Sequence, residues 1–231
     1  MTNEILINQK LFTYQVIKKR IGSIRLKLNS SSSFQISAPF LTPNFLIQKF
    51  INQNSDWITL HSSKLVDKTD ILDLRFIEIL GKKYDLFFYK TQKNSVLIFE
   101  DDQKIYLNLA TFTNSQAKKV LEKRLRLFAL KLIKTEIRNL SLQYGFKYQK
   151  VAVRNQSSRY GSCSGAGNLS FNWQIVFFPI DKFQHILLHE LTHLDIKNHS
   201  AKFWNQLTIY DSNCHQNNLW LKKEGTKHFL F

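Results

Sequence analysis

Hydrophobic and polar residues alternate in short runs through the first half of the chain, a pattern typical of β-strands with one buried face. Three such runs lie within residues 5–38 and are separated by turn residues, which predicts a three-stranded antiparallel meander. Thr42 and Pro43 favour the start of a helix, with Thr42 as N-cap and Pro43 as the first helical residue. An apolar stripe continues this helix to about Leu60, and three further strand-like runs follow between residues 77 and 109.

The pattern changes to the helical period over residues 114–144, and Gly145 is a natural end for this long helix. A strand-like run at 148–154 comes next. The polar, glycine-containing segment 155–168 separates it from a second strand-like run at 169–178.

Another apolar stripe with the helical period follows Asp181, which is a suitable N-cap residue. Its members are Phe183, Ile186, Leu187, Leu191 and Leu194. The alternation of periods predicts an α+β fold with two parts: a strand-rich region with one helix at 1–110, and a second unit at 111–231 with a long helix, two strand-like runs and the helix of this stripe. A charged stretch at 64–70 has the composition of a connector, and no internal repeat is visible.

Composition narrows the class of protein. The hydrophobic content of 43% is sufficient for a core, yet no run of about 18 apolar residues is present, so we expect no membrane-spanning helix. The first ten residues lack the basic and apolar regions of a signal peptide. The two cysteines, Cys163 and Cys214, are too few for a disulfide framework, so we expect free thiols and a cytoplasmic location.

The formal net charge is +16, from 33 Lys and Arg against 17 Asp and Glu. Such an excess permits binding to nucleic acid or another polyanion. However, most of the excess is Lys in a chain also rich in Asn, Ile and Phe, which can reflect an A/T-rich genome. No basic motif interleaved with aromatic residues is present, so a nucleic-acid partner is permitted but not indicated by a motif.

The last helical stripe contains the pentapeptide His189-Glu190-Leu191-Thr192-His193, an H-E-x-x-H motif. On an α-helix, residues four apart are displaced by about 40° around the axis and roughly 6 Å along it. His189 and His193 can therefore bind one metal ion, while Glu190 can reach a water molecule beside it without being a ligand.

A third ligand is needed, and His199 is the candidate. It can return to the metal only if the helix ends soon after Leu194 and the chain folds back, and Asn198 suits such a turn because Asn tolerates the left-handed conformation. Three protein ligands and one water form the open site of a catalytic zinc centre. The sequence therefore predicts one Zn²⁺ held by His189, His193 and His199.

Two blocks of residues around the pentapeptide match a family pattern. The first block consists of Arg159, Gly161, Ser162, Cys163, Asn168, Ser170, Asn172 and Trp173. The second consists of His189, Glu190, His193, Asn198, His199, Ser200, Phe203 and Trp204. In these blocks, and in its N-terminal half, the chain resembles the YgjP-like predicted metal-dependent hydrolases, relatives of the SprT-type and WLM-type minimal zinc peptidases. One departure is Tyr160, where Trp is usual.

The resemblance implies a minimal zincin, in which a long helix backs a small sheet and the active-site helix lies against that sheet. It also implies that the strand of LSFNW (169–173) is the sheet edge facing the cleft, where an extended substrate can add as a further strand. Arg159, Ser162, Asn172 and Trp173 are then candidate substrate-binding residues, of which the first two could orient a substrate carbonyl or phosphate.

We therefore expect a zinc-dependent hydrolase, most simply a metallopeptidase in which Glu190 accepts a proton from the water. One alternative is hydrolysis of a nucleotide phosphoanhydride, because the same metal site with Arg159 suits a small anionic substrate. A second alternative is a DNA-associated protease, which should show salt-sensitive affinity for DNA. A non-catalytic module that retains the metal is a third, and the intact Glu190 argues against it.

Overall fold

The computed structural model describes residues 2–62, 70–156 and 159–230 and divides the chain into two compact units. Unit 1 comprises residues 1–68 and unit 2 comprises residues 69–231. The boundary predicted after residue 110 thus lies inside unit 2, because the second group of strands packs on the long helix and shares its core. Except for Asp70, the connector predicted at 64–70 lies outside the described residues.

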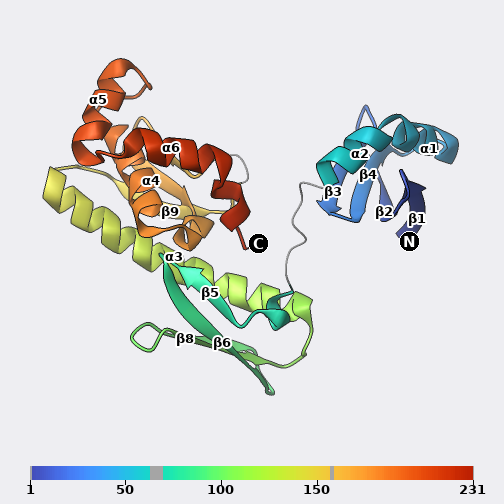
Figure 1. Cartoon of the computed structure of the whole chain (residues 1–231), viewed down its shortest axis with the longest axis horizontal. Coiled ribbons are helices and arrows are strands. Elements are labelled where there is room, and N and C mark those ends of the chain that lie inside the picture. Colours follow the sequence, from blue (N-terminus) through green and yellow to red (C-terminus); the bar gives the residue numbers. More distant parts are fainter. Residues whose placement is uncertain (1, 63–69, 157–158, 231) are drawn as a thin grey trace. The chain divides into compact units, whose positions relative to one another are not determined.

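Unit 1 is one four-stranded sheet with two helices against one of its faces (Figure 1). Its elements are β1 (Thr2–Ile7), β2 (Lys10–Lys19), β3 (Arg25–Ser30), β4 (Ser33–Pro39), α1 (Asn44–Gln53) and α2 (Ser55–Ser62). Alternate strand residues and the facing helix residues form the core, which includes Phe12, Phe34, Ile36, Ile47, Ile51 and Ile58. The single helix predicted to Leu60 is divided at Asn54, and Pro43 is its N-cap residue.

The predicted three-stranded meander is wrong. The strand order is β1-β2-β4-β3, with β2 parallel to β4 and β3 antiparallel to β4. Only two residues connect β3 to β4, which is the length of a tight hairpin. The connection from β2 to β3, residues 20–24, is longer and can cross over the position of one strand. β2 and β3 are therefore consecutive in sequence but not adjacent in the sheet.

Unit 2 begins with a second sheet that has the same connectivity. Its strands are β5 (Phe76–Ile79), β6 (Lys82–Lys90), β7 (Ser95–Phe99) and β8 (Lys104–Leu109), in the order β5-β6-β8-β7. Each sheet opens with a hairpin whose two turn residues have positive φ, Asn8 and Gln9 in the first and Leu80 and Gly81 in the second. The structure thus contains a repeated arrangement of four strands that the sequence does not display. β5 and β6 are two separate strands, where the sequence pattern predicted a single strand-like run.

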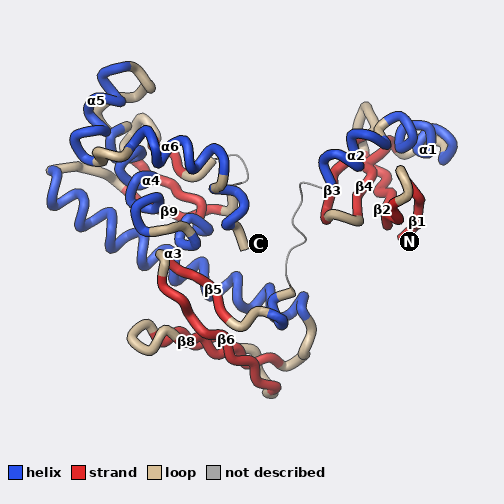
Figure 2. The backbone as a smooth tube through the Cα atoms, in the orientation of Figure 1, coloured by secondary structure: helices blue, strands red, loops and turns tan. Residues whose placement is uncertain are grey.

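The long helix α3 (Asn114–Tyr144) joins the two parts of unit 2. The Thr113 side chain accepts a hydrogen bond from the Gln116 N–H at its start, and Gly145 ends it with a φ of 77°. The β5–β8 sheet packs against its first half, and the region of the later helices packs against its second half (Figures 1 and 2). This predicted element is confirmed with the predicted bounds.

A third sheet lies on α3 beside the later helices. Its strands are β9 (Lys150–Arg154), β10 (Gly161–Cys163) and β11 (Asn168–Asn172), in the order β10-β11-β9. β11 is parallel to β9 and antiparallel to β10. The strand predicted to reach residue 178 instead ends at Asn172, and the chain continues as the 3₁₀ helix η2 (Trp173–Phe177). β10 lies within the polar segment 155–168, for which the sequence pattern indicates no strand.

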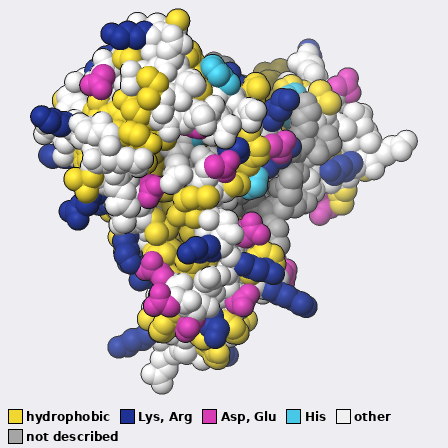
Figure 3. Space-filling view, turned by 60° about the vertical axis from the view of Figure 1, so that its left-hand side comes forward, with side chains coloured by type: hydrophobic (Ala, Val, Ile, Leu, Met, Phe, Trp, Pro, Cys, Tyr) yellow, Lys and Arg dark blue, Asp and Glu magenta, His cyan; other side chains and the backbone are white. Residues whose placement is uncertain are grey.

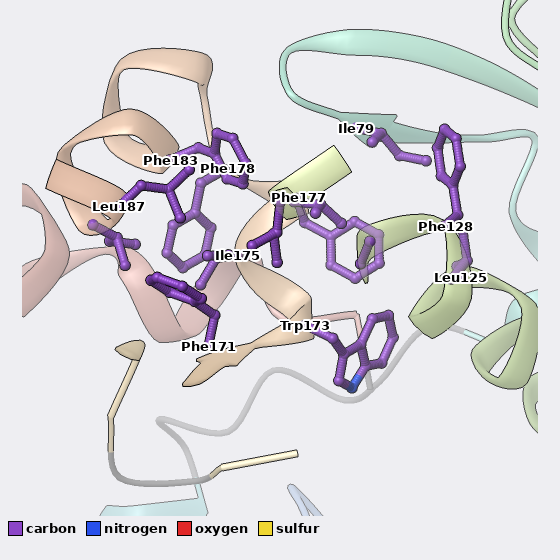
Figure 4. Close-up of a cluster of buried hydrophobic side chains, with 14 of the residues drawn as sticks. Ile79, Leu125, Phe128, Phe171, Trp173, Ile175, Phe177, Phe178, Phe183 and Leu187 are labelled. Atoms are coloured by element: carbon purple, nitrogen blue, oxygen red, sulfur yellow. The ribbon is translucent and has the colours of Figure 1, made fainter. Parts of the chain in front are cut away.

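The remaining helices are α4 (Ile180–Thr192), α5 (Ala201–Tyr210), α6 (Cys214–Lys223) and the 3₁₀ helix η3 (Gly225–His228). Aromatic residues of β11 and η2 are buried between α3 and α4, and the ring centroids of Trp173 and Phe177 lie 5.6 Å apart (Figure 4). The α+β class with a long helix and small mixed sheets is confirmed. No helix within the described residues has the length and apolar character needed to cross a membrane.

Candidate metal centre and active-site cleft

Helix α4 positions the first two histidines and the carboxylate of the H-E-x-x-H motif. Its N-cap residue is Pro179, so Asp181 lies in the first turn and is not the cap that the sequence predicted. Glu190 points into the protein with an exposed fraction of 7%. His189 lies in the last turn and His193 is the C-cap residue, so both imidazoles are carried by the same end of the helix.

The chain turns back directly after α4, as the return of a third histidine requires. The Ile196 N–H donates to the Thr192 carbonyl oxygen at 3.0 Å and closes the turn. Asn198 contributes through its side chain, whose oxygen accepts a hydrogen bond from the Ser200 N–H at 3.3 Å. The left-handed conformation predicted for Asn198 is not adopted. His199 is thereby directed at the end of α4.

The three predicted histidines converge. The Nε2 atom of His199 lies 2.9 Å from that of His189 and 3.1 Å from that of His193. Zn–N bonds of about 2.0–2.1 Å would hold tetrahedral ligand atoms roughly 3.3 Å apart. The donor set and its spacing therefore fit one ion, and the residues present are a suitable metal site.

The protonation of the histidines also fits metal binding. His193 donates its Nδ1–H to the Ile196 carbonyl oxygen at 2.8 Å, which leaves the Nε2 lone pair directed at the other imidazoles. Burial, followed by the charges of His193, His199 and His185, lowers the pKa of His189 to about 3. Burial likewise lowers the pKa of His193. Both rings are therefore neutral at pH 7 and can act as ligands.

Glu190 is held against a glycine of β10. A Cβ atom placed on Gly161 would lie 2.6 Å from Cγ and 2.7 Å from Oε1 of Glu190, so only glycine leaves room for this carboxylate. Burial raises the pKa of Glu190 to about 7, and the nearby charge of Arg159 opposes the rise. The carboxylate thus lies between the metal ligands and β10, where it can reach a molecule in the cleft.

Phe203 supports all three imidazoles, a role that the sequence did not suggest. Its fully buried ring lies 4.5 Å from the ring centroid of His193, 4.8 Å from that of His189 and 4.9 Å from that of His199. Trp204 contacts His199 more distantly, at 6.1 Å. Phe203 follows His199 by four residues and lies on the next helix. This spacing is the sequence signal from which the contact could have been inferred.

The histidines line a cavity of about 420 Å³ between α4, β10 and α6. Its wall includes Arg159, Tyr160, Gly161, Ser162, Cys163, His185, Glu190, Lys197 and Asn218. Two of the predicted substrate-binding residues, Arg159 and Ser162, are therefore in the cleft. Lys197 and Asn218 also line it and were not predicted.

The sheet edge in the cleft is β10, and the expectation that LSFNW forms this edge is wrong. β11 is the central strand, and β10 pairs with it on one side only. The Asn172 N–H donates to the Tyr160 carbonyl oxygen, and the Ser164 N–H donates to the Asn168 carbonyl oxygen. Because antiparallel hydrogen bonding alternates, the backbone groups of Gly161 point away from β11, to the open edge.

Asn172 and Trp173 do not reach the cleft. Both are 0% exposed, and neither lines the cavity. The Asn172 side chain accepts a hydrogen bond from the Gln174 N–H and donates to the Gln156 carbonyl oxygen, which fixes the transition from β11 to η2. These two residues shape the core under the sheet and do not contact a ligand in the cleft.

The C-terminal segment fixes the start of β10. The Tyr160 hydroxyl donates to the Leu221 carbonyl oxygen at 3.0 Å, and its ring packs on Phe178 and Phe229. A Cβ atom on Gly225 would lie 2.3 Å from the Tyr160 hydroxyl oxygen. The backbone at Gly225 therefore packs against Tyr160 too closely for any side chain to fit. Tyr160 is therefore a partly buried residue that connects the start of β10 to the C-terminal segment. Both cysteines are free, with Cys163 in the cleft and Cys214 in the core.

A buried polar network lies behind the metal site. His185 is 1% exposed and its Nδ1 atom lies 2.6 Å from Oδ2 of Asp211. The Asn217 side-chain amide donates to the same oxygen at 3.0 Å, and the Lys182 ammonium donates to Oδ1 of the Asn217 side chain at 2.6 Å. Burial alone would raise the pKa of Asp211, but the hydrogen bonds from His185 and Asn217 outweigh it and lower that pKa.

This network should make the stability of the protein depend on Asp211 at acid pH. A carboxyl group whose pKa is lower in the folded than in the unfolded state stabilises the fold above its unfolded pKa, about 3.9, and loses that contribution as the pH falls through the folded pKa. We expect Asp211→Asn to flatten the fall of Tm below about pH 4. Thermal unfolding of the wild type, Asp211→Asn and the exposed-turn control Asp102→Asn measures this, and parallel curves for all three would contradict it.

Charged side chains of both signs share one face of unit 2. On the face of unit 2 shown in Figure 3, Lys and Arg side chains are interspersed with Asp and Glu. This face therefore offers no continuous basic surface for a nucleic acid.

Comparison with known proteins places this site in a family context. The family model described as "YgjP-like, metallopeptidase domain" matches residues 22–224. No curated protein matches the chain.

Among solved structures, the chain is similar to the metallopeptidase zymogen jannalysin of Methanocaldococcus jannaschii, with 25% identity and a TM-score of 0.36. It is also similar to the metallopeptidase zymogen abylysin of Pyrococcus abyssi, with 17% identity and a TM-score of 0.35. Each similarity covers 40% of this chain and 95% of the other chain.

Proposed function

We propose that the chain, which belongs to the YgjP-like metallopeptidase family, is a zinc-dependent peptidase with a minimal zincin core. The observation that carries the proposal is the convergence of three imidazole Nε2 atoms beside a buried carboxylate and an open strand edge. These are the parts that hydrolysis of an extended polypeptide requires: a metal site, a base and a backbone-binding strand.

His189, His193 and His199 would hold the metal, and three neutral imidazoles favour zinc among the common cellular metals. When bound, zinc supplies a Lewis acid that polarises a carbonyl group and lowers the pKa of a water molecule toward about 7. Phe203 keeps the three rings in their converging orientation. Because there are only three protein ligands, the site has the open form of a catalytic centre.

Glu190 would be the general base. It accepts a proton from the attacking water and returns it to the leaving amine, a role that contributes roughly 10²-fold to 10⁴-fold in rate. Its carboxylate faces the cleft because Gly161 leaves space for it.

β10 would bind the substrate. An extended polypeptide can pair with the free edge of β10, which aligns its backbone along the cleft and past the metal site. Ser162 and Arg159 lie in the same wall and can donate hydrogen bonds to substrate oxygens. This mode favours an extended segment, because its backbone N–H and C=O groups are free to pair with the strand.

The test is metal analysis of the purified full chain followed by parallel assays on an unfolded polypeptide and on nucleoside triphosphates. We expect about one zinc per chain, and proteolysis that a chelator abolishes and added zinc restores. Release of phosphate or pyrophosphate from the nucleotides without proteolysis would overturn the proposal in favour of phosphoanhydride hydrolysis. Proteolysis that appears only with DNA present would identify a DNA-associated protease instead.

A further inference from the structure

The cleft wall contains two cationic side chains, and their net charge is not explained by the hydrogen bonds proposed for Arg159. Arg159 and Lys197 both line the cleft, and Glu190 is the only carboxylate among its lining residues. Glu190 is buried, whereas Arg159 and Lys197 are exposed. The accessible part of the wall is therefore positively charged.

The two cations are at opposite ends of β10. Arg159 precedes the strand, next to Tyr160. Lys197 is at the other end, where it also lines a smaller cavity of about 250 Å³ with the turn Gly165–Gly167 that follows β10. Burial raises the pKa of the Cys163 thiol and the charge of Lys197 opposes this rise, which places the ammonium group near the last residue of β10.

Within the described residues neither cation has an ion-pair partner, although the Arg159 charge is close enough to lower the pKa of the buried Glu190. Among the described residues, the ion pairs involve other side chains, and no carboxylate lies within ion-pair distance of Arg159 or Lys197. Cationic side chains that flank a cleft without internal partners favour anionic groups on whatever occupies it.

We propose that the cleft selects polypeptide segments with acidic residues on both sides of the bond that is cleaved. This inference rests on the proposed peptidase function and specifies its substrate. The four steps from Arg159 to Cys163 span roughly 13 Å when extended, at about 3.3 Å per residue. A strand paired with β10 has the same spacing, so the two favoured acidic positions are roughly four residues apart. Arg159 contacts one and Lys197 contacts the other.

The test compares peptides with one central sequence and with acidic, neutral or basic residues at the flanking positions. A partly exposed ion pair is worth up to about 1 kcal/mol, which is about fivefold. We expect kcat/KM to be about tenfold higher for acidic than for neutral flanks, and lower still for basic flanks. This ratio should fall to about threefold in Arg159→Gln and in Lys197→Gln, and to about one in the double variant. It should also fall at high ionic strength.

Lys202→Gln is the matched control, because Lys202 is exposed on α5 and does not line the cleft. The charge reversal Lys197→Glu should convert the preference at one flank from acidic to basic. A ratio near one in the wild type, or a ratio that the double variant retains, would overturn the inference. Circular dichroism of each variant shows whether it is folded.

Binding provides a readout that does not depend on hydrolysis. Fluorescence anisotropy of the labelled peptides with the full-chain Glu190→Gln variant should give the same order of affinities, acidic above neutral above basic. If no peptide is cleaved by the wild type, the peptidase proposal fails, and the anisotropy still decides the charge preference. Equal affinities for all three peptides would overturn the preference whether or not cleavage occurs.

Discussion

Glu190→Gln should reduce peptide hydrolysis by roughly 10²-fold to 10⁴-fold and leave the metal bound, because the variant loses the general base and keeps all three histidines. The amide has nearly the shape of the carboxylate, and a neutral side chain is well tolerated at a position that is 7% exposed. The measurements are kcat on an unfolded polypeptide and the zinc content of the same preparation.

The matched control is Glu122→Gln, which removes a carboxylate from α3 that lies 3.8 Å from Arg126 on the surface. This variant should hydrolyse the polypeptide like the wild type. Full turnover in Glu190→Gln with zinc retained would show that another group is the base. Loss of zinc from Glu190→Gln would assign the carboxylate to the metal site instead.

Gly161→Ala should reduce kcat by about 100-fold, because the added methyl group occupies the space of the Glu190 carboxylate. The new Cβ would lie 2.6 Å from Cγ and 2.9 Å from Cδ, so either the carboxylate or β10 must move. A displacement of about 1 Å in a reacting group can cost about 10²-fold in rate. The metal content should be unchanged, because the three atoms nearest to the new Cβ all belong to Glu190 and none to a histidine.

Gly165→Ala is the control for this prediction, because a Cβ there meets no atom within 4 Å and the residue has no positive φ. A second comparison distinguishes an effect of Gly161→Ala on Glu190 from a general disturbance of the structure. If Gly161 acts through Glu190, adding Gly161→Ala to Glu190→Gln should cost little further activity. Equal activity of Gly161→Ala and the wild type would contradict the steric account.

The local features of the site could be predicted from the sequence. The spacing of His189 and His193 is set by the helix, and the return of His199 follows from the short turn that the residue count allows. The long helix at 114–144 was predictable for the same reason, since its periodicity and its end at Gly145 are properties of neighbouring residues.

The strand pairings could not be predicted in this way, because they join residues distant in sequence. Nothing local distinguishes the parallel pairing of β2 with β4 from a meander, or shows that β10 lies outside β11. The role of Asn172 was misassigned for a related reason: a polar residue in a motif suits a ligand contact or a buried hydrogen bond equally well, and only the three-dimensional contacts distinguish them. Phe203 was overlooked because an apolar residue on a helix is normally assigned to the core.

The central claim is that three imidazoles bind one metal ion, and X-ray absorption at the zinc edge of the purified full chain tests it most directly. The account predicts three imidazole nitrogens at about 2.0–2.1 Å. It also predicts loss of most of the zinc in His199→Ala but not in His215→Ala, whose ring packs on Trp204 outside the triad. A spectrum with two imidazoles, or a His199→Ala protein with undiminished zinc, would contradict it.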